Sequence, residues 1–360
     1  MTETQQYQQP RPTVPCKYRA GRELGRGTYA VVKEMQHIAS GQRYAGKIIN
    51  KQKMVGHETS ISNELGILRR LHPTPHVLTL ADYFETPSSV YLITELCTGE
   101  LFDLLRQPLS PVECNRLVRQ LVQGVVALHQ AGVVHRDLKP ENCLLNSSGD
   151  LVIGDFGMAR VLDQTDRPLT SLCGTPGYMA PEMLLRTGHG TPADMWAVGV
   201  IACFMLTGSN PFHGAGQKLA LTEASLGSML RHLRSRRPDI NAYAWSFVEG
   251  LLQYDPARRM TAEQALAHPW LSPYPSPGLS PYASPYMSPY LTPYTQDSRI
   301  VTASSAEQTD AEAQQVLALN HLLSAYFAAG PSTWQPLTPP STPGGSSLQH
   351  SRETTLHQRM

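Results

Sequence analysis

The chain has 360 residues, of which 41% are hydrophobic and 16% are charged, enough for the core of one large or two modest domains. Its 30 lysines and arginines nearly balance its 29 aspartates and glutamates, so no overall field favours nucleic acid or an acidic membrane. The cysteines form no Cys-x-x-Cys pair, and both a signal peptide and a membrane-length apolar run are lacking, which predicts a cytoplasmic or nuclear protein without structural zinc or disulfides.

The first hundred residues predict a small lobe built mainly from strands. Short alternating stretches separated by glycines, from residue 18 to 50, predict antiparallel strands. Apolar residues recur at helical spacing in ETSISNELGILRRL, residues 58–71, and predict one long helix. Two further strands are predicted from HVLTLADYF, residues 76–84, and SVYLITEL, residues 89–96. Beyond residue 99 the spacing is helical almost throughout, so we expect an α+β fold with a larger, mainly helical second lobe.

The two ends of the chain have the composition of segments without a packed core. Residues 1–17 are rich in glutamine and proline, which is typical of disorder. Residues 272–360 form a Pro/Ser/Tyr-rich low-complexity tail, in which the prolines of SPYPSPGLSPYASPYMSPYLTPY prevent regular backbone hydrogen bonding. One short helix is predicted in this tail at 311–329, before the stop signal Gly330-Pro331. The Ser-Pro and Thr-Pro steps are candidate sites for a proline-directed kinase, with a plain spacer as the simpler interpretation.

A glycine motif, Gly25-x-Gly27, lies between two predicted strands. Alone it is equally well explained as a tight hairpin, because glycine is the default residue of strained turns. Lys47 on the next strand favours a phosphate site, in which backbone N–H groups cover the phosphates and the lysine supplies positive charge. Glu64, on the predicted helix away from its apolar stripe, is the better partner for Lys47. The alternative, Glu58, lies near the helix start and could instead complement the helix dipole.

The stretch HRDLKPEN, residues 135–142, places an acid, two cations and an amide at the end of an apolar run. Phosphoryl transfer needs a carboxylate that orients the attacking hydroxyl, cations that neutralise developing charge, and oxygen ligands for magnesium. Asp137 is the candidate base, Lys139 the candidate cation and Asn142 a candidate magnesium ligand. Asp155, between a short apolar strand and a glycine, is a candidate for the same metal. This second acidic motif disfavours the alternative, a buried ion-pair cluster without a catalytic role.

These motifs together resemble the eukaryotic protein kinases over about residues 18–271. They follow the order and spacing of that family: Gly25-x-Gly27, Lys47, Glu64, HRDLKPEN, DFG at 155–157, APE at 180–182, DMWAVG at 194–199 and DPARRMT at 255–261. The lysine in HRDLKPEN and the segment CGTPGYMAPE are similar to the serine/threonine class, and LITELCTGELFDLL is similar to the calcium/calmodulin-dependent protein kinase group. The resemblance implies a two-lobed protein kinase fold that uses ATP and Mg²⁺ to phosphorylate hydroxyls of protein substrates.

The resemblance also implies roles for individual residues. The catalytic group would be Asp137, Lys139, Lys47 and Glu64, and Mg²⁺ would be bound by Asn142 and Asp155. The ATP site would comprise Leu24, Gly25, Arg26, Gly27, Val32, Ala45, Lys47, Glu95, Cys97, Glu100, Leu144 and Asp155, with Thr94 as gatekeeper. Four residues would stack as a spine, although ordinary core packing explains them equally well: Leu68, Leu80, His135 and Phe156. Two anchors would have structural roles: Asp194 beneath the catalytic loop, and Arg259 paired with Glu182.

Residues 158–179, between DFG and APE, form a polar stretch that we term the activation segment. Arg136, next to the candidate base, would be an unpaired cation unless an anion docks on it. Phosphorylation of Ser171 or Thr170, by an upstream kinase or by the protein itself, would supply that anion and order the segment. Ser171 is favoured because it lies four residues before Thr175, the position usual in the family.

Glu100 and Glu141 match positions that receive arginines in basophilic relatives, which predicts a preference for Arg-x-x-Ser/Thr; the alternative is two solvated surface charges. Residues 310–330 lack the lysines and arginines of a calmodulin-binding helix, which argues against calmodulin control, although the resemblance keeps calmodulin open as a partner. The main alternative function is a pseudokinase scaffold that binds nucleotide and partner proteins. It is disfavoured because all the catalytic and metal-binding candidates are present.

Overall fold

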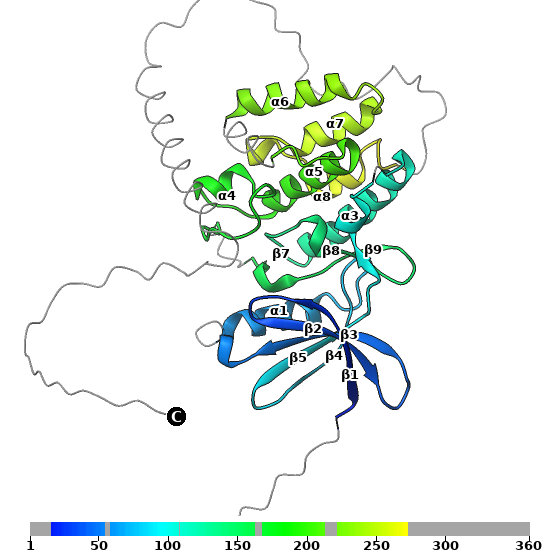
Figure 1. The fold of residues 1–360 in the computed structure, drawn as a ribbon. Coiled ribbons are helices and arrows are strands. Elements are labelled where there is room, and N and C mark those ends of the chain that lie inside the picture. Colours follow the sequence, from blue (N-terminus) through cyan, green and yellow to red (C-terminus); the bar gives the residue numbers. More distant parts are fainter. Residues whose placement is uncertain (1–15, 55–57, 108, 163–167, 213–221, 273–360) are drawn as a thin grey trace, which may run out of the picture. The chain divides into compact units, whose positions relative to one another are not determined.

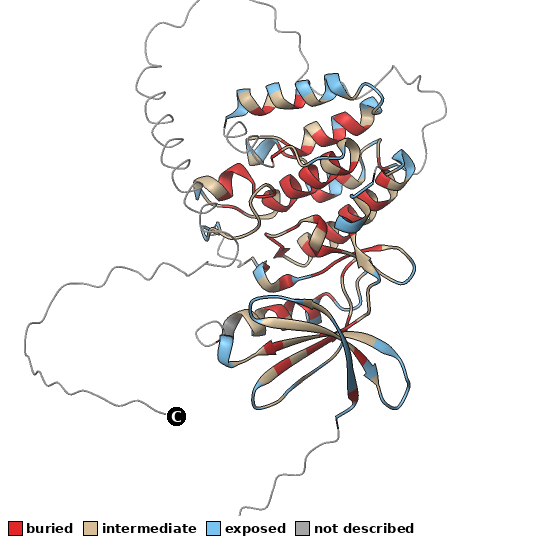
Figure 2. Cartoon of the chain, in the orientation of Figure 1, coloured by how far each residue is buried: buried red, intermediate tan, exposed pale blue. Residues whose placement is uncertain are grey.

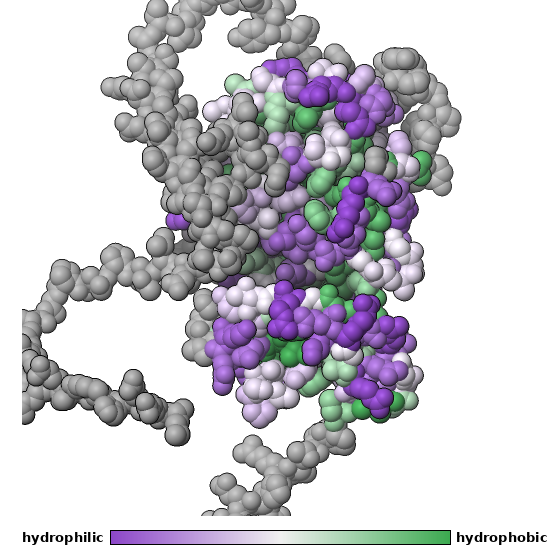
Figure 3. All heavy atoms as spheres, viewed as in Figure 1, coloured by the Kyte–Doolittle hydropathy of each residue, from purple (hydrophilic) through white to green (hydrophobic). Residues whose placement is uncertain are grey.

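A computed structural model of the chain describes residues 16–54, 58–107, 109–162, 168–212 and 222–272. All of them lie within one compact unit of the chain. They form a small lobe of strands with one long helix and a larger lobe of helices, which confirms the predicted α+β architecture (Figure 1). Hydrophilic residues cover much of both lobes on the face drawn in Figure 3. The predicted tail helix and the first fifteen residues of the N-terminal segment lie outside the described residues.

The small lobe is an antiparallel sheet in the strand order β1-β2-β3-β5-β4. Its elements are β1 (Tyr18–Arg26), β2 (Ala30–His37), β3 (Arg43–Asn50), the single-turn η1 (Gln52–Met54), α1 (Glu58–Arg70), β4 (Leu80–Glu85) and β5 (Ser89–Thr94). The apolar stripe of α1, which includes Ile67 and Leu68, joins Ile49 and Leu92 of the sheet in the main core. This packing holds α1 against the sheet whose strand β3 carries Lys47.

The large lobe is mainly helical, with several short strands. Its elements are β6 (Gly99–Glu100), α2 (Leu101–Leu104), α3 (Pro111–Gln130), β7 (Val133–Val134), η2 (Pro140–Asn142), β8 (Cys143–Leu145), β9 (Leu151–Ile153), η3 (Phe156–Met158), β10 (Arg160–Val161), α4 (Pro181–Leu185), α5 (Thr191–Thr207), α6 (Glu223–Arg236), α7 (Ala242–Leu251), η5 (Pro256–Arg258) and α8 (Ala262–Leu266). Figure 2 shows α5 buried along most of its length, as expected for a helix that is apolar on all sides. None of the described helices is long and apolar enough to cross a membrane.

The segment between α1 and β4 differs from the prediction, because β4 begins at Leu80 and not at His76. The residues before it bond to the large lobe instead. Ile153 N–H donates to His76 O at 2.9 Å, and Leu78 N–H donates to Ile153 O at 2.9 Å. Gly124 of α3 permits this approach, since an added Cβ would lie 2.7 Å from His76 O. The small lobe is therefore fastened to β9 through residues 76–78.

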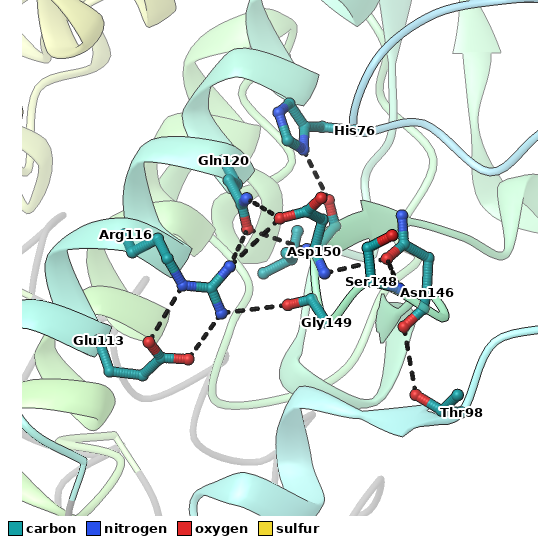
Figure 4. A network of polar contacts seen from close by, with 10 residues as sticks. His76, Thr98, Glu113, Arg116, Gln120, Asn146, Ser148, Gly149 and Asp150 are labelled. Atoms are coloured by element: carbon teal, nitrogen blue, oxygen red, sulfur yellow. Dashed lines mark hydrogen bonds and ion pairs between the residues drawn. The ribbon is translucent and has the colours of Figure 1, made fainter.

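A polar network fastens the turn between β8 and β9 to α3 (Figure 4). Arg116 Nη2 donates to Gly149 O at 3.1 Å, and Gln120 Nε2 donates to Asp150 Oδ1 at 2.6 Å. These bonds fix the start of β9, which ends two residues before Asp155. The back of the large lobe thus positions a residue of the candidate metal site.

Two predicted anchors of the large lobe are confirmed. Asp194 on α5 accepts the backbone N–H groups of His135 and Arg136, each at 2.8 Å. Arg259 Nη1 and Nη2 donate to Glu182 Oε1 and Oε2 at 2.8 and 3.1 Å, and both side chains are almost fully buried. Asp194 therefore supports the loop that carries the candidate base. The four predicted spine residues are all buried, which core packing alone would also produce: Leu68, Leu80, His135 and Phe156.

Removal of the Arg259 guanidinium would leave Glu182 buried without its partner. We therefore expect Arg259→Ala to lower the free energy of unfolding by about 3 to 5 kcal/mol. Arg234→Ala is the matched control, because its ion pair with Glu249 is partly exposed, and such pairs contribute less than about 1 kcal/mol. Urea unfolding followed by circular dichroism measures both variants. A loss at position 259 no larger than at position 234 would contradict the assigned role.

Candidate active site

Lys47 lies on β3 between two carboxylates. Its Nζ is 2.6 Å from Glu64 Oε1 and 2.9 Å from Asp155 Oδ1, so the predicted pair with Glu64 is present. Burial disfavours the charged ammonium, but the two carboxylates outweigh this effect and raise the pKa of Lys47. Lys47 therefore keeps its positive charge at every physiological pH.

Asp155 follows β9 with a left-handed backbone, at φ 53°. Such conformations cost a non-glycine residue about 1 to 3 kcal/mol and cluster at functional sites. The positive charge of Lys47 holds the pKa of the Asp155 carboxyl at about 2. Because the side chain is still 53% exposed, this ionised carboxylate can bind a further cation.

Asp137 lies at the centre of a second cluster. Its Oδ1 accepts a hydrogen bond from Thr175 Oγ1 at 2.7 Å, and its Oδ2 lies 3.2 Å from Lys139 Nζ and accepts from Asn142 Nδ2 at 3.2 Å. Lys139 Nζ also donates to Thr175 Oγ1 at 2.7 Å. The three predicted residues of this loop are thus in contact, and Thr175 of the activation segment joins them.

Thr175 is a site residue to which the sequence analysis gave no role. Its one signal was its position in CGTPGYMAPE, the segment that resembles the serine/threonine class. A hydroxyl that donates to the candidate base and accepts from the candidate cation fixes the distance between them. The activation segment therefore contributes directly to the geometry around Asp137.

The two predicted magnesium ligands are adjacent, because Gly154 N–H donates to Asn142 O at 2.8 Å and Asp155 is the next residue. The Asn142 amide nitrogen donates to Asp137 O at 2.8 Å, which leaves the amide oxygen for a ligand. One carboxylate and one amide oxygen suit Mg²⁺, which takes most of its other ligands from phosphate and water. The described residues contain no cluster of three or more His, Cys, Asp or Glu that could hold a metal. The pair therefore fits a metal that is shared with a phosphate ligand.

The glycine turn, formed by the last two residues of β1 and by Gly27, has space for a ligand. An added Cβ at Gly25 would meet no described atom within 4 Å, and one at Gly27 would meet only Ala30 O, at 3.8 Å. Neither glycine has a positive φ. Gly27 N–H donates to Ala30 O at 2.9 Å, so the turn does close a hairpin. Neither packing nor backbone conformation requires glycine here, which leaves room for close approach of a ligand. Arg26 pairs with Glu23 at 2.7 Å on the surface, so only its backbone would serve a phosphate site.

The apolar residues of the predicted ATP site come from both lobes. Leu24, Val32 and Ala45 lie on the neighbouring strands β1, β2 and β3, and Leu144 lies on β8. All four side chains are half-buried, so each keeps apolar surface that the described chain does not cover. Leu144 also packs against the residue before Asp155, since a Cβ on Gly154 would lie 3.0 Å from Leu144 Cδ1.

The connection between the lobes carries two further residues of the predicted ATP site, Glu95 and Cys97. Glu95 N–H donates to Thr79 O at 3.0 Å, and Glu95 Oε1 accepts from Thr79 N–H at 2.8 Å. Thr94, the predicted gatekeeper, is buried. The backbone of Cys97 makes no hydrogen bond within the described residues. Glu95 is therefore held in place, while Cys97 has backbone groups for a ligand.

Glu100, predicted for the nucleotide site, lies on β6 in an acidic environment. Burial and the nearby charges of Asp103 and Glu141 raise the pKa of its carboxyl. Glu141 Oε2 is buried and has no hydrogen-bond partner among the described residues. Because a buried carboxylate oxygen without a donor is destabilising, Glu100 and Glu141 together suit a cation from outside the chain.

Arg136 contacts the activation segment at two points. Its Nη1 donates to Ser171 Oγ at 2.7 Å, and its Nε donates to Met158 O at 2.7 Å. Both acceptors are neutral oxygens, and burial lowers the pKa of the guanidinium. Ser171 therefore lies where a phosphate would give Arg136 an anionic partner, whereas the exposed Thr170 has no described contact with it.

Residues 18–271 match the model of the family described as protein kinase domain. The chain belongs to the protein kinase family. The kinase is 44% identical over 272 residues to calcium/calmodulin-dependent protein kinase cmkB of Emericella nidulans, a match that covers 72% of this chain and 66% of the relative. It is 45% identical over 267 residues to calcium/calmodulin-dependent protein kinase type I of Schizosaccharomyces pombe, covering 72% of this chain and 79% of the relative. It is 38% identical to serine/threonine-protein kinase H1 of Mus musculus, covering 72% and 62%.

These matches place the kinase among the serine/threonine kinases, close to the calcium/calmodulin-dependent group, as its motifs predicted. The chain spans 66% of the length of the first relative and 62% of the third. Protein kinase domains in general use ATP and Mg²⁺. The oxygen ligands, the lysine and the open glycine turn of this kinase are the groups that such a pair of cofactors needs.

Proposed function

We propose that this protein transfers the γ-phosphoryl group of ATP to serine and threonine hydroxyls of other proteins. The convergence of Lys47, Asp137, Asn142 and Asp155 from separate segments of the chain carries the proposal. An ion-pair cluster with a purely structural role would enclose its charges, whereas Asp155 keeps 53% of its side chain exposed. The exposed Asp155 carboxylate therefore favours a site that binds a ligand with a cation.

Each side chain has its own task in this proposal. Lys47 binds phosphate oxygens, while the N–H groups of the glycine turn cover the phosphates. Asp137 accepts a hydrogen bond from the substrate hydroxyl and orients it for attack, and Lys139 lies beside the transferred group. When bound through Asn142 and Asp155, Mg²⁺ supplies positive charge that neutralises the phosphate oxygens.

The purified 360-residue chain should phosphorylate a basic serine peptide with MgATP, and Asp155→Asn should lower turnover by at least about 100-fold. The change keeps the shape of the side chain but removes the charge opposite Lys47. Asp239→Asn, at an exposed pair with Arg237, is the matched control and should keep wild-type turnover. Transfer of labelled phosphate measures all three proteins. Wild-type protein that binds nucleotide without transferring phosphate would instead support the pseudokinase scaffold.

We further propose a preference for Arg-x-x-Ser/Thr sites, with Glu100 and Glu141 as the receptor for the arginine. A guanidinium could donate to Glu141 Oε2, which has no partner in the described part of the chain. Hydrogen bonds between two charged groups are among the strongest in proteins. Burial, Asp103 and Glu141 raise the pKa of the Glu100 carboxyl. A cation bound beside it would stabilise the ionised carboxylate and lower this pKa again.

The two glutamates make this preference testable. Wild-type kcat/KM should be at least about tenfold higher for a peptide with arginine than for one with alanine three residues before the acceptor. Glu141→Gln should bring the two peptides close to parity, mainly by weakening use of the arginine peptide. Glu263→Gln, on the exposed face of α8, is the control and should preserve the ratio. Equal use of both peptides by the wild type would refute the preference.

We propose that phosphorylation of Ser171, by an upstream kinase or by the protein itself, raises activity by giving Arg136 an anionic partner. Turnover of Ser171→Ala should be about tenfold lower than that of wild-type protein phosphorylated on Ser171, since the variant lacks the charge-assisted contact with Arg136. Thr170→Ala should have the smaller effect, because Arg136 donates to Ser171. Steady-state assays of both single variants and the double variant test this. Unchanged turnover in the double variant would count against control at this segment.

The names of the two fungal relatives include calmodulin dependence. In this chain residues 310–330, which lie outside the described residues, contain no lysine or arginine. We therefore propose that phosphorylation of Ser171, rather than calmodulin, is the main means of control. Saturable binding of calcium-loaded calmodulin to the 360-residue chain would reverse this order. We also propose a cytoplasmic or nuclear location, which fractionation of cells can test.

A further inference from the structure

One side chain of α1 reaches across to the activation segment. Asn63 Nδ2 donates to Ala159 O at 2.7 Å, although the two residues are 96 positions apart in sequence. Asn63 immediately precedes Glu64, and consecutive residues of a helix point in different directions. Helix α1 therefore presents Glu64 to Lys47 and Asn63 to the activation segment at the same time.

The acceptor carbonyl has little else to satisfy it. Ala159 is fully buried. Among the described residues, the other donor near its oxygen is Arg160 Nη1 at 3.4 Å, which is long for a hydrogen bond. A buried carbonyl that loses its donor is destabilising. The Asn63 amide is thus the main contact that holds this carbonyl to α1.

The preceding carbonyl is held from the other lobe. Arg136 Nε donates to Met158 O at 2.7 Å, and Arg136 Nη1 donates to Ser171 Oγ at 2.7 Å. Two successive carbonyls are therefore gripped from opposite sides, one by the arginine beside the candidate base and one by α1. A continuous series of contacts runs from Ser171 through Arg136 and these carbonyls to Asn63.

We propose that Asn63 is a positioning residue that couples the activation segment to the nucleotide site. By binding Ala159 O it holds α1 where Glu64 can pair with Lys47, and through the shared carbonyl pair it passes the state of Ser171 to that ion pair. The inference rests on the proposed kinase function and assigns Asn63 a positioning role within it. The simpler alternative is a hydrogen bond that only stabilises the fold, and the two make different kinetic predictions.

Asn63→Ala removes the donor without weakening the helix, because alanine has the higher helix propensity. KM for ATP should rise and kcat should fall, together lowering kcat/KM for ATP about tenfold, while KM for the peptide changes less than about twofold. Amide hydrogen exchange of α1 should become faster. Ser62→Ala, at an exposed neighbouring position of the same helix, is the matched control and should match the wild type in every measurement.

Two further substitutions separate positioning from packing. Asn63→Asp keeps the shape of the side chain but turns a carboxylate oxygen toward a carbonyl oxygen. Its kcat/KM for ATP should therefore fall at least as far as that of Asn63→Ala. Asn63→Gln keeps the amide donor and should recover part of the loss. A role in stability alone would lower the melting temperature of Asn63→Ala while KM for ATP stayed at the wild-type value in the folded protein, and that result would overturn the proposal.

A double-mutant cycle of Asn63→Ala and Ser171→Ala measures the coupling between the two residues. The wild type and Asn63→Ala, which retain Ser171, are phosphorylated on it before the assay. We expect strong non-additivity, with the double variant within about twofold of the worse single variant in kcat/KM for ATP. Losses that multiply to about 100-fold would show independent effects and overturn the inference, while leaving kinase function intact. Absence of phosphoryl transfer by the wild type would overturn the proposed function instead, so the two failures are distinguishable.

Discussion

A lysine ammonium that lies mostly out of water must keep its compensating carboxylates close, and the site is organised around this constraint. The carboxylates next to Lys47 come from α1 and from the turn after β9, so one electrostatic requirement joins both lobes. Packing of α1 on the sheet sets the position of Glu64, and the network between α3 and the β8–β9 turn supports the strand that leads to Asp155. Movement of either element would leave Lys47 with a single partner. The nucleotide site therefore forms or comes apart as a unit.

The polar groups of the large lobe fall into two kinds. Asp194, Glu182 and Arg259 have their hydrogen-bonding capacity met by other groups of the chain, and they hold the fold together. Glu141 Oε2 is buried without a partner among the described residues, and Asp155 remains half exposed. Among these charged groups, the satisfied ones hold structure, and the unsatisfied ones mark places where a ligand would compensate the charge. This contrast separates scaffold from site without reference to any motif.

Local patterns in the sequence predicted much of this arrangement, and contacts between distant segments account for the rest. Helical periodicity placed α1 and put Glu64 off its apolar stripe, so the pair with Lys47 could be foreseen. Thr175 could not, because a lone threonine has no distinctive spacing and its partner Asp137 lies 38 residues away. The alternating pattern from residue 76 predicted a strand, but hydrogen bonds to β9 decided the local structure. Backbone acceptors such as Ala159 O leave no trace in side-chain patterns at all.

The bonds between residues 76–78 and β9 limit how the two lobes can separate. Because this stretch belongs to the small lobe by sequence and to the large lobe by hydrogen bonding, it forms a natural pivot. A rocking motion of the sheet would rotate about it, with displacements that grow with distance from the axis. Residues 76–78 would then keep their place beside β9 while the rest of the sheet changed its distance from the large lobe.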